Sequence, residues 1–600
     1  MPHRHQAALA EQPLRELPAL ALRRALRTGY AGADLRADLL AGVVVGIVAL
    51  PLSMALAIAS GVSPQHGLYT AIVAGGVTAL LGGSRCQVSG PTAAFVVVLA
   101  PISAEFGVGG LMLASLLAGL LLAAMGALRL GALIRFVPHP VTTGFTAGIA
   151  LVIATLQVKD LLGLDVAEMP GHYVERVQAL AAALPSAQAD ELAVGAATLA
   201  LLLAWPRLGT RVPAPLVALA LAALGAWLAA RLVPGFEVDT IASRFHYASQ
   251  GATWGGIPRT PPLFAWPWTQ PGPDGRPIGL SLELLRDLVP SAFAIAMLGA
   301  IESLLSAVVA DGMGGTGDHG APARHDPDAE LLAQGLGNVA APFFGGFAAT
   351  GALARTATNV RAGARSPMAA FFHAGFVLFA VLSLAPLLGL LPMSALAALL
   401  LLVAWNMSEL KHFAHVLRVA PRSDVAVLLV CFVLTVLFDM VVAVSVGIVL
   451  AALLFMRRMA ELSSVTLVGR AHEEISPPLP PGVVVYDIGG PLFFGAAQKA
   501  MSSLEAVGAG VRTVVLDVRD VPAMDATGLV NLESTIDRLA RAGIAVILGG
   551  VAAQPAEVLA RAGWKSEEGR LVICDRFDDA IALARLLAPP PARSGKPAAP

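Results

Sequence analysis

The chain has 600 residues, of which 56% are hydrophobic and only 14% are charged, and its mean hydropathy is +0.73. A typical soluble domain carries about 25% charged residues, so this composition excludes a string of soluble domains and indicates a membrane protein. A net charge of -1 gives no reason to expect nucleic-acid binding. The three cysteines, Cys86, Cys431 and Cys574, lie too far apart in the sequence to suggest a metal site or a disulfide framework.

Long runs without charge predict the membrane spans. Residues 39–84 and 366–408 contain no Asp, Glu, Lys or Arg, and each run is long enough for two spans of about 20 residues. With two shorter segments at 91–104 and 350–360, we expect about fourteen helices. The other apolar segments are 108–128, 140–158, 191–205, 213–230, 288–310, 331–344, 368–391, 394–406, 425–438 and 440–456.

Basic residues gather in alternate loops. If about fourteen helices alternate in direction, every basic cluster falls on one face, which the positive-inside rule makes cytoplasmic. Both termini are then cytoplasmic, and we expect a multi-pass protein of the bacterial inner membrane, in contact with membrane lipid. The clusters contain Arg23, Arg24, Arg27, Arg85, Arg129, Arg135, Arg207, Arg211, Arg361, Arg365, Lys411, Arg418, Arg422, Arg457 and Arg458.

The two short segments occupy corresponding places. Each is the third span of a seven-span half, roughly 39–232 and 285–457, and an odd number of spans per half inverts the second half. The expected fold is therefore a polytopic α-helical membrane protein of 7+7 inverted repeats with two half-helices. Short segments interrupted by Gly or Pro in two inverted halves indicate a transporter's binding site. The alternative is a pair of re-entrant packing helices that bind no ligand.

A second domain is expected after the membrane part. Strand patterns and amphipathic helices alternate between residues 483 and 588, which predicts a small cytoplasmic α/β domain. The expected organisation is a cytoplasmic N-terminal segment at 1–38, a transport domain at 39–460, a linker at 461–482, the α/β domain at 483–588 and a disordered tail at 589–600.

The candidate binding site lies where the two short helices begin. Helix N-termini present unpaired N–H groups and a partial positive charge, so two that meet near the midplane form an anion site. The first residues would be Thr92 and Ala93 on one side, and Gly351 and Ala352 on the other. The candidate substrate-binding residues are Ser53, Gly90, Pro91, Thr92, Ala93, Thr350, Gly351, Ala352 and Arg355.

Two isolated charges accompany this site. Arg355, one turn into the second short helix, adds a full positive charge, and the alternative is a structural cation or one that reaches the interface. Glu302 lies mid-membrane, where desolvation favours the protonated carboxyl, and Ser306 shares its helical face. We expect Glu302 and Ser306 to couple protons. The rival interpretation is a structural Glu302–Arg355 ion pair, and both could hold if protons control the pair.

No enzyme, metal site or cofactor is expected. The sequence shows no nucleophile–base pair, metal-ligand cluster or Walker loop at suitable spacing.

Several segments of the chain form a recognisable set: SGPTAAF at 89–95, VP at 137–138, GFTAGI at 144–149, GAIESLLS at 299–306, GLGN at 335–338, FGG at 344–346 and ARTATNVRAG at 354–363. Through these segments together, the chain resembles the SulP anion transporters with a C-terminal STAS domain over nearly its whole length. The resemblance implies a core domain that moves against a gate domain, with substrate between the third and tenth helices. Within the family, the chain looks closest to the bacterial aerobic four-carbon dicarboxylate permeases, through IESLL at 301–305, PFFGG at 342–346 and VAWNMSE at 403–409.

Two departures from the family's patterns bear on function. Sodium-coupled bicarbonate members carry an Asp with a Thr one turn later on the eighth helix, whereas this chain has Glu302 and Ser306. This difference argues against a sodium-binding site and favours protons as the coupling ion. Bacterial STAS proteins that antagonise anti-sigma factors have a phosphorylatable Ser before a Gly, where this chain has Thr527 before Gly528. Thr527 is either a regulatory site or an N-capping Thr.

The leading hypothesis for the function is secondary active transport, in which protons drive uptake of C4-dicarboxylates such as succinate, fumarate or aspartate. Bicarbonate or sulfate transport is the alternative within the family. An anion-gated sensor or channel that signals through the STAS domain is the alternative outside it. We also expect a homodimer and a cytoplasmic protein partner for the STAS domain.

Overall fold

The computed structural model describes residues 17–132, 137–166, 169–210, 212–249, 252–313, 324–438, 440–462, 464–468, 477–493, 510–567 and 569–587. The expected tail at 589–600 lies outside these residues. The chain divides into two compact units, Met1–Ile448 and Val449–Pro600, and each is described by itself.

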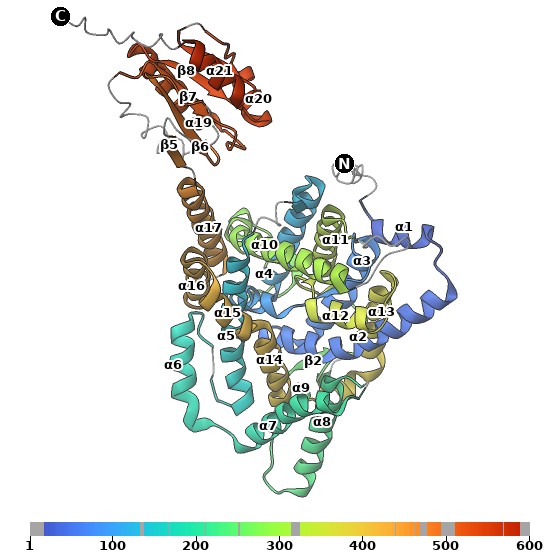
Figure 1. Ribbon diagram of the computed structural model, residues 1–600. Helices are drawn as coiled ribbons and strands as arrows, with labels where there is room; N and C mark the ends of the chain where they lie inside the picture. Colours follow the sequence, from blue (N-terminus) through green and yellow to red (C-terminus); the bar gives the residue numbers. More distant parts are fainter. Residues whose placement is uncertain are drawn as a thin grey trace, which may run out of the picture. The chain divides into compact units, whose positions relative to one another are not determined.

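The first unit is helical (Figure 1), and each predicted apolar segment coincides with a helix. Its helices are α1 (Leu20–Arg27), α2 (Gly32–Ala59), α3 (Pro64–Leu81), α4 (Ala93–Ala127), α5 (His139–Leu162), α6 (Tyr173–Ala183), α7 (Ala189–Ala204), α8 (Ala214–Leu232), α9 (Ile241–Arg244), α10 (Leu282–Met313), α11 (Pro327–Ala340), α12 (Leu353–Arg361), α13 (Met368–Gly389), α14 (Met393–Ser408), α15 (Leu410–Val419) and α16 (Arg422–Leu437). Helix α17 (Met440–Leu462) begins in this unit and ends in the next.

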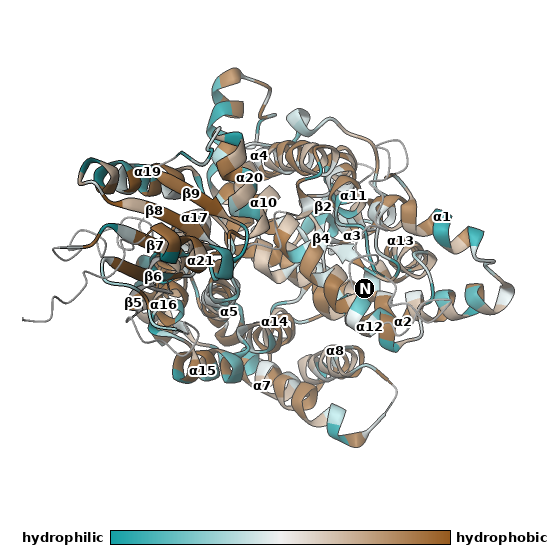
Figure 2. Cartoon of the chain, turned by 45° about the horizontal axis from the view of Figure 1, so that its top comes forward, coloured by the Kyte–Doolittle hydropathy of each residue, from teal (hydrophilic) through white to brown (hydrophobic). Residues whose placement is uncertain are grey.

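These helices have the length and composition of membrane spans. Within the described part of the chain, nine helices are long and apolar enough to cross a membrane. Residues of the long helices are mostly brown in Figure 2, which marks them as hydrophobic. The predicted class, a polytopic α-helical membrane protein, is confirmed.

Helix α4 joins two segments that were expected to be separate, 91–104 and 108–128. Gly107 interrupts it with φ 69°, a conformation that costs glycine little because it has no Cβ. A Cβ at this position would also lie 2.5 Å from the carbonyl carbon of Gly272. The short half-helix and the following span are therefore continuous in the chain but bend at a glycine.

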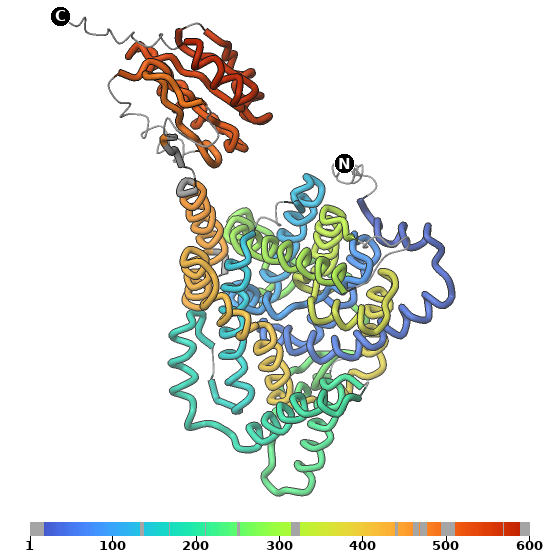
Figure 3. Tube along the Cα trace, in the orientation of Figure 1, coloured from blue at the N-terminus to red at the C-terminus, as the bar shows by residue number. Residues whose placement is uncertain are grey.

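The helices of the two halves interleave into two groups. In the core group, the most extensive contacts join α4 with α10 and α11, α3 with α11 and α13, and α2 with α13. In the gate group, α5 packs against α14 and α16, and α7 packs against α8 and α14. The tube in Figure 3 shows the same interleaving, with α10 to α13 in green and yellow among the blue helices α2 and α3. Each group therefore draws helices from both halves, as inverted repeats do.

Some elements of this unit were not predicted. Helix α2 begins at Gly32, so the expected boundary at residue 38 falls inside a helix. The short helices α1, α6, α9 and α15 were also missed, as was a hairpin of β2 (His246–Ser249) and β3 (Ala252–Gly255). These elements are too short or too polar to produce an apolar span pattern.

The second unit contains a five-stranded sheet of order β5-β6-β7-β8-β9. The strands are β5 (Ser464–Val468), β6 (Val483–Gly489), β7 (Thr513–Asp517), β8 (Ala545–Gly549) and β9 (Leu571–Cys574). Strands β6 to β9 are parallel, while β5 is antiparallel to β6. The expected linker at 461–482 was therefore wrong in part, because β5 lies within it and belongs to the sheet.

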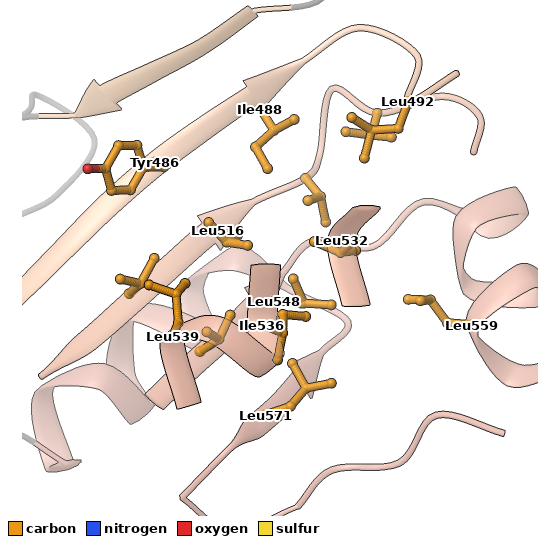
Figure 4. Close-up of a cluster of buried hydrophobic side chains, with 14 of the residues drawn as sticks. Tyr486, Ile488, Leu492, Leu516, Leu532, Ile536, Leu539, Leu548, Leu559 and Leu571 are labelled. Carbon is orange, nitrogen blue, oxygen red and sulfur yellow. The ribbon is translucent and has the colours of Figure 1, made fainter. Parts of the chain in front are cut away.

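Among the described residues, this α/β unit also contains helices α19 (Ala526–Arg541), α20 (Ala553–Arg561) and α21 (Phe577–Leu587). Figure 4 shows apolar side chains of α19 and of the strands packed together, among them Leu532, Ile536, Leu516 and Leu548. In Figure 2 the strands are brown and α19 carries teal residues, the pattern of an amphipathic helix on a buried sheet.

Candidate functional site

The two half-helices begin at a short pair of strands. Strand β1 (Ser89–Gly90) pairs antiparallel with β4 (Thr350–Gly351), with Ser89 opposite Gly351 and Gly90 opposite Thr350. Two residues separate the end of β1 from the start of α4, and one residue separates the end of β4 from the start of α12. This pairing of extended segments from opposite halves brings the two helix N-termini together.

The caps of these helices leave their first turns open. Thr92 is the N-cap of α4 and Ala352 is the N-cap of α12. Among the described residues, neither N-cap side chain accepts a hydrogen bond from its own helix. N–H groups of a first turn have no partner within the helix, so both N-termini can donate to an anion. The structure starts α12 at Leu353, so Gly351 precedes the helix instead of opening it.

Arg355 lies beside the paired strands β1 and β4, and its side chain is only 1% exposed. Its Nη2 donates to Ser53 Oγ and to the Pro91 carbonyl, each at 3.1 Å. Its Nε and Nη1 have no hydrogen-bond partner among the described residues. A Cβ at Gly90 would lie 2.5 Å from Nη1, so the absence of a side chain there admits the guanidinium. Arg355 therefore presents a buried cation with three N–H groups, one on Nε and two on Nη1, that have no partner among the described residues.

Glu302 does not pair with Arg355. Within the described residues, no ion pair includes either side chain. Glu302 Oε2 instead accepts a hydrogen bond from Thr92 Oγ1 at 3.0 Å. The carboxyl is partly buried and is thus connected to the N-cap of α4. The rival interpretation, a direct structural ion pair, is absent from the structure.

Ser306 faces a different partner from Glu302. Its Oγ donates to Thr356 Oγ1 at 2.9 Å, and both residues are fully buried. Thr356 Oγ1 also accepts from the Val88 N–H at 3.1 Å. Ser306 therefore connects α10 to α12 and to the chain just before β1. Its expected part in proton coupling stays a prediction.

Other buried polar side chains hold the extended segments, and sequence reasoning missed most of them. Gln87 Nε2 donates to Ser303 Oγ at 3.0 Å, and Thr350 Oγ1 donates to the Gly299 carbonyl at 2.9 Å. Helix α11 adds three further polar residues, Glu330, Gln334 and Asn338, all buried. The available signal was their spacing of four residues within an apolar helix.

Thr527 lies in the first turn of α19, in the second unit, and is partly buried. The N-cap of this helix is Asp525, whose Oδ1 accepts from the Gly528 N–H at 2.7 Å. The hypothesis that Thr527 is the N-cap was therefore wrong. Its expected regulatory role is left as a prediction.

Known proteins are similar to the chain over most of its length. The sulfate permease family matches residues 35–433, and the STAS domain matches residues 474–580. The chain is 38% identical over 536 residues to the putative sulfate transporter YvdB of Bacillus subtilis, covering 88% of this chain and 94% of that protein. It is 29% identical over 526 residues to the bicarbonate transporter BicA of a Picosynechococcus species, covering 84% and 87%. The solved structure of the murine Slc26a9 anion transporter in its inward-facing state has the same fold, with a TM-score of 0.81 at 18% identity and 97% coverage of both chains.

Proposed function

Since the chain belongs to the sulfate permease family and carries a STAS domain, we propose that it is a secondary active transporter of small anions. The observation that carries this proposal is the buried Arg355 guanidinium, whose Nε and Nη1 have no partner among the described residues, beside the β1–β4 pair from which the two half-helices start. A buried cation without a carboxylate partner is costly unless an anion joins it. An anionic substrate would supply that partner.

Charge balance favours a dianion together with a proton. Two helix N-termini contribute about +0.5 each and Arg355 contributes +1, so the site carries roughly +2 when Glu302 is neutral and +1 when it is ionised. A dianion is therefore matched by protonated Glu302. A proton on Glu302 should tighten anion binding, and bound anion should favour that proton to the same extent.

The proposed substrates are C4-dicarboxylates such as succinate, fumarate and aspartate, taken up with protons. The resemblance to aerobic dicarboxylate permeases and the Glu302 that stands where sodium-coupled members carry Asp support this choice. Sulfate and bicarbonate are the second candidates, because YvdB is named a putative sulfate transporter and BicA a bicarbonate transporter.

Counterflow of labelled succinate in liposomes tests the proposal. Vesicles that hold the purified protein and excess unlabelled succinate should accumulate the label, without sodium and faster as external pH falls toward about 5–6. Excess sulfate or bicarbonate outside should leave this uptake in place if dicarboxylates are preferred. Counterflow of sulfate or bicarbonate but not succinate would instead select the second candidates.

An anion that binds but never crosses the membrane would point to the remaining alternative, an anion-gated sensor that signals through the STAS domain. Thermal stabilisation by the anion without counterflow would be its signature.

We also propose a homodimer in the bacterial inner membrane, with both termini cytoplasmic and a protein partner for the STAS domain. The one-sided distribution of basic residues supports the orientation. Labelling of single cysteines in right-side-out and inverted vesicles tests it, since residues next to Arg85 and Arg418 should react only in inverted vesicles.

A further inference from the structure

Helix α11 turns a row of polar side chains toward the two extended segments of the site. Glu330, Gln334 and Asn338 are four residues apart and therefore lie on one face. Gln334 and Asn338 are fully buried and Glu330 is 1% exposed. Burying such groups costs free energy unless they are hydrogen-bonded. Their partners therefore reveal what this row holds in place.

The two outer members of the row hold one extended segment each. Glu330 Oε2 accepts hydrogen bonds from the N–H groups of Gly83 at 3.0 Å and Ser84 at 2.9 Å, in the chain before β1. Asn338 Oδ1 accepts from the Ala349 N–H at 2.7 Å, and its Nδ2 donates to the Ala349 carbonyl at 2.8 Å. Ala349 directly precedes β4.

Gln334, the middle member, contacts both segments at once. Its Oε1 accepts from Ser89 Oγ at 2.9 Å, and its Nε2 donates to the Ala349 carbonyl at 2.7 Å. Ser89 stands three residues before Thr92, the N-cap of α4, and Ala349 stands three residues before Ala352, the N-cap of α12. A single amide thus joins equivalent positions of the two inverted halves.

We propose that Gln334 is a positioning residue that determines specificity: it sets the separation of the two half-helix N-termini and so the size of the anion that contacts both. The inference rests on the proposed function, because it takes the anion to bind between Thr92 and Ala352. The β1–β4 pair aligns the two segments with each other, whereas Gln334 fixes both against α11. Without it, the segments keep their pairing, and Glu330 and Asn338 still hold one segment each, but the single side chain that connects both segments is lost.

A length series of dianions tests the proposal. KM and turnover are measured by counterflow in proteoliposomes for sulfate, malonate, succinate and glutarate. The variant is Gln334→Met, which keeps the side-chain length, donates no hydrogen bond and accepts only weakly through sulfur. We expect the KM ratio between the smallest and the largest anion to change about five-fold or more, because a buried hydrogen bond contributes about that factor. Turnover of the best-fitting anion should stay close to that of the unaltered protein.

The matched control is Gln157→Met, which makes the same change at a buried glutamine of the gate helix α5. It should leave the ranking of anions unchanged. Ser89→Ala removes only one of the two contacts of Gln334, so it should shift the ranking less and in the same direction. The double variant should shift it no further than Gln334→Met alone, because both changes break one connection.

An unchanged ranking in Gln334→Met, or an equal loss of affinity for every anion, would overturn the proposal and leave Gln334 a packing residue. If Gln334→Met fails to fold, the ranking in Ser89→Ala decides by the same measure. Unaltered protein that moves none of the four anions would instead contradict the proposed transport of dicarboxylates and of sulfate, and the inference would fail with it.

Discussion

The Arg355 guanidinium has the largest expected effect of any single side chain in the site. Arg355→Ala removes the full positive charge while the β1–β4 pair and both half-helices keep their own hydrogen bonds. We expect anion affinity to fall by about 100-fold or more, since charge-assisted hydrogen bonds in a buried site are the strong ones. Thermal shift by succinate or sulfate measures the affinity.

Arg361→Ala is the control for this change, because Arg361 lies on the same helix but is exposed. It should leave affinity almost unchanged. Equal affinity in Arg355→Ala and the unaltered protein, both folded, would make Arg355 a structural cation and remove the main support for the proposed site.

Glu302→Gln separates binding from proton coupling. Gln keeps the neutral, protonated form and still accepts a hydrogen bond from Thr92, so binding and counterflow should survive. Accumulation driven by a pH gradient should be lost, because the side chain no longer carries a proton. Uptake of labelled succinate into vesicles with and without an imposed pH gradient measures this.

Ser306→Ala tests the second residue for which proton coupling is predicted. Because Ser306 donates to Thr356, its loss should cost about 1 kcal/mol of stability, and its predicted part in proton coupling requires proton-driven accumulation to fall as well. Accumulation by Glu302→Gln on a pH gradient, or a strict need for sodium, would disprove the proposed coupling.

The charged residues of the site could be predicted from the sequence, whereas the neutral polar residues that hold the extended segments in place could not. Arg355 and Glu302 stand out because an isolated charge in an apolar segment has few uses. Gln334 does not, since a neutral amide among apolar residues is compatible with many packing roles. Only the structure shows that its partners come from both halves of the chain.

At the scale of elements, Gly90 in strand β1 leaves the space that the Arg355 guanidinium occupies. Gly90→Ala would place a methyl group 2.5 Å from Arg355 Nη1, so the guanidinium must move away from the β1–β4 pair. We expect anion KM to rise about ten-fold or more, because the cation no longer faces both half-helices. Counterflow kinetics and a melting temperature together measure this effect.

Gly76→Ala provides the matched control within the core group. A Cβ at Gly76 meets only the Ala374 Cβ, at an ordinary 3.7 Å. Its KM should equal that of the unaltered protein. A Gly90→Ala variant with unchanged KM would show that the Arg355 position is not critical for binding.

The helices could be predicted where contact with lipid requires a long run of apolar residues. Every long apolar run became a helix, because a chain in hydrocarbon must satisfy its own backbone hydrogen bonds. Strand β5 was missed, since an edge strand of five residues has little pattern of its own and pairs with β6 only through the fold. The bend at Gly107 was visible only as a gap between two predicted segments.

At the scale of the whole molecule, inversion explains why the site lies where it does. Both groups of helices combine members of the two halves, so the third helix of each half meets the other by symmetry. Gln334 and Arg355 both lie in the second half of the chain and contact residues of the first half. These contacts make the site asymmetric. We infer that one half supplies most of the recognition and the other supplies the second helix N-terminus.

The last prediction concerns where the soluble domain can be removed. Deleting residues 476–600 removes β6 to β9 but leaves β5 without its partner, and an unpaired strand promotes aggregation. Deleting 464–600 removes the whole sheet.

Both deletion variants should insert in the membrane, because the helices of the first unit satisfy their own backbone hydrogen bonds. Only the longer deletion should elute as a single peak in size-exclusion chromatography, while counterflow should fall in both if the STAS domain takes part in assembly or regulation of the transporter. Single peaks of equal width for both variants would show that β5 is harmless alone, and full activity of the longer deletion would show that transport does not need the STAS domain.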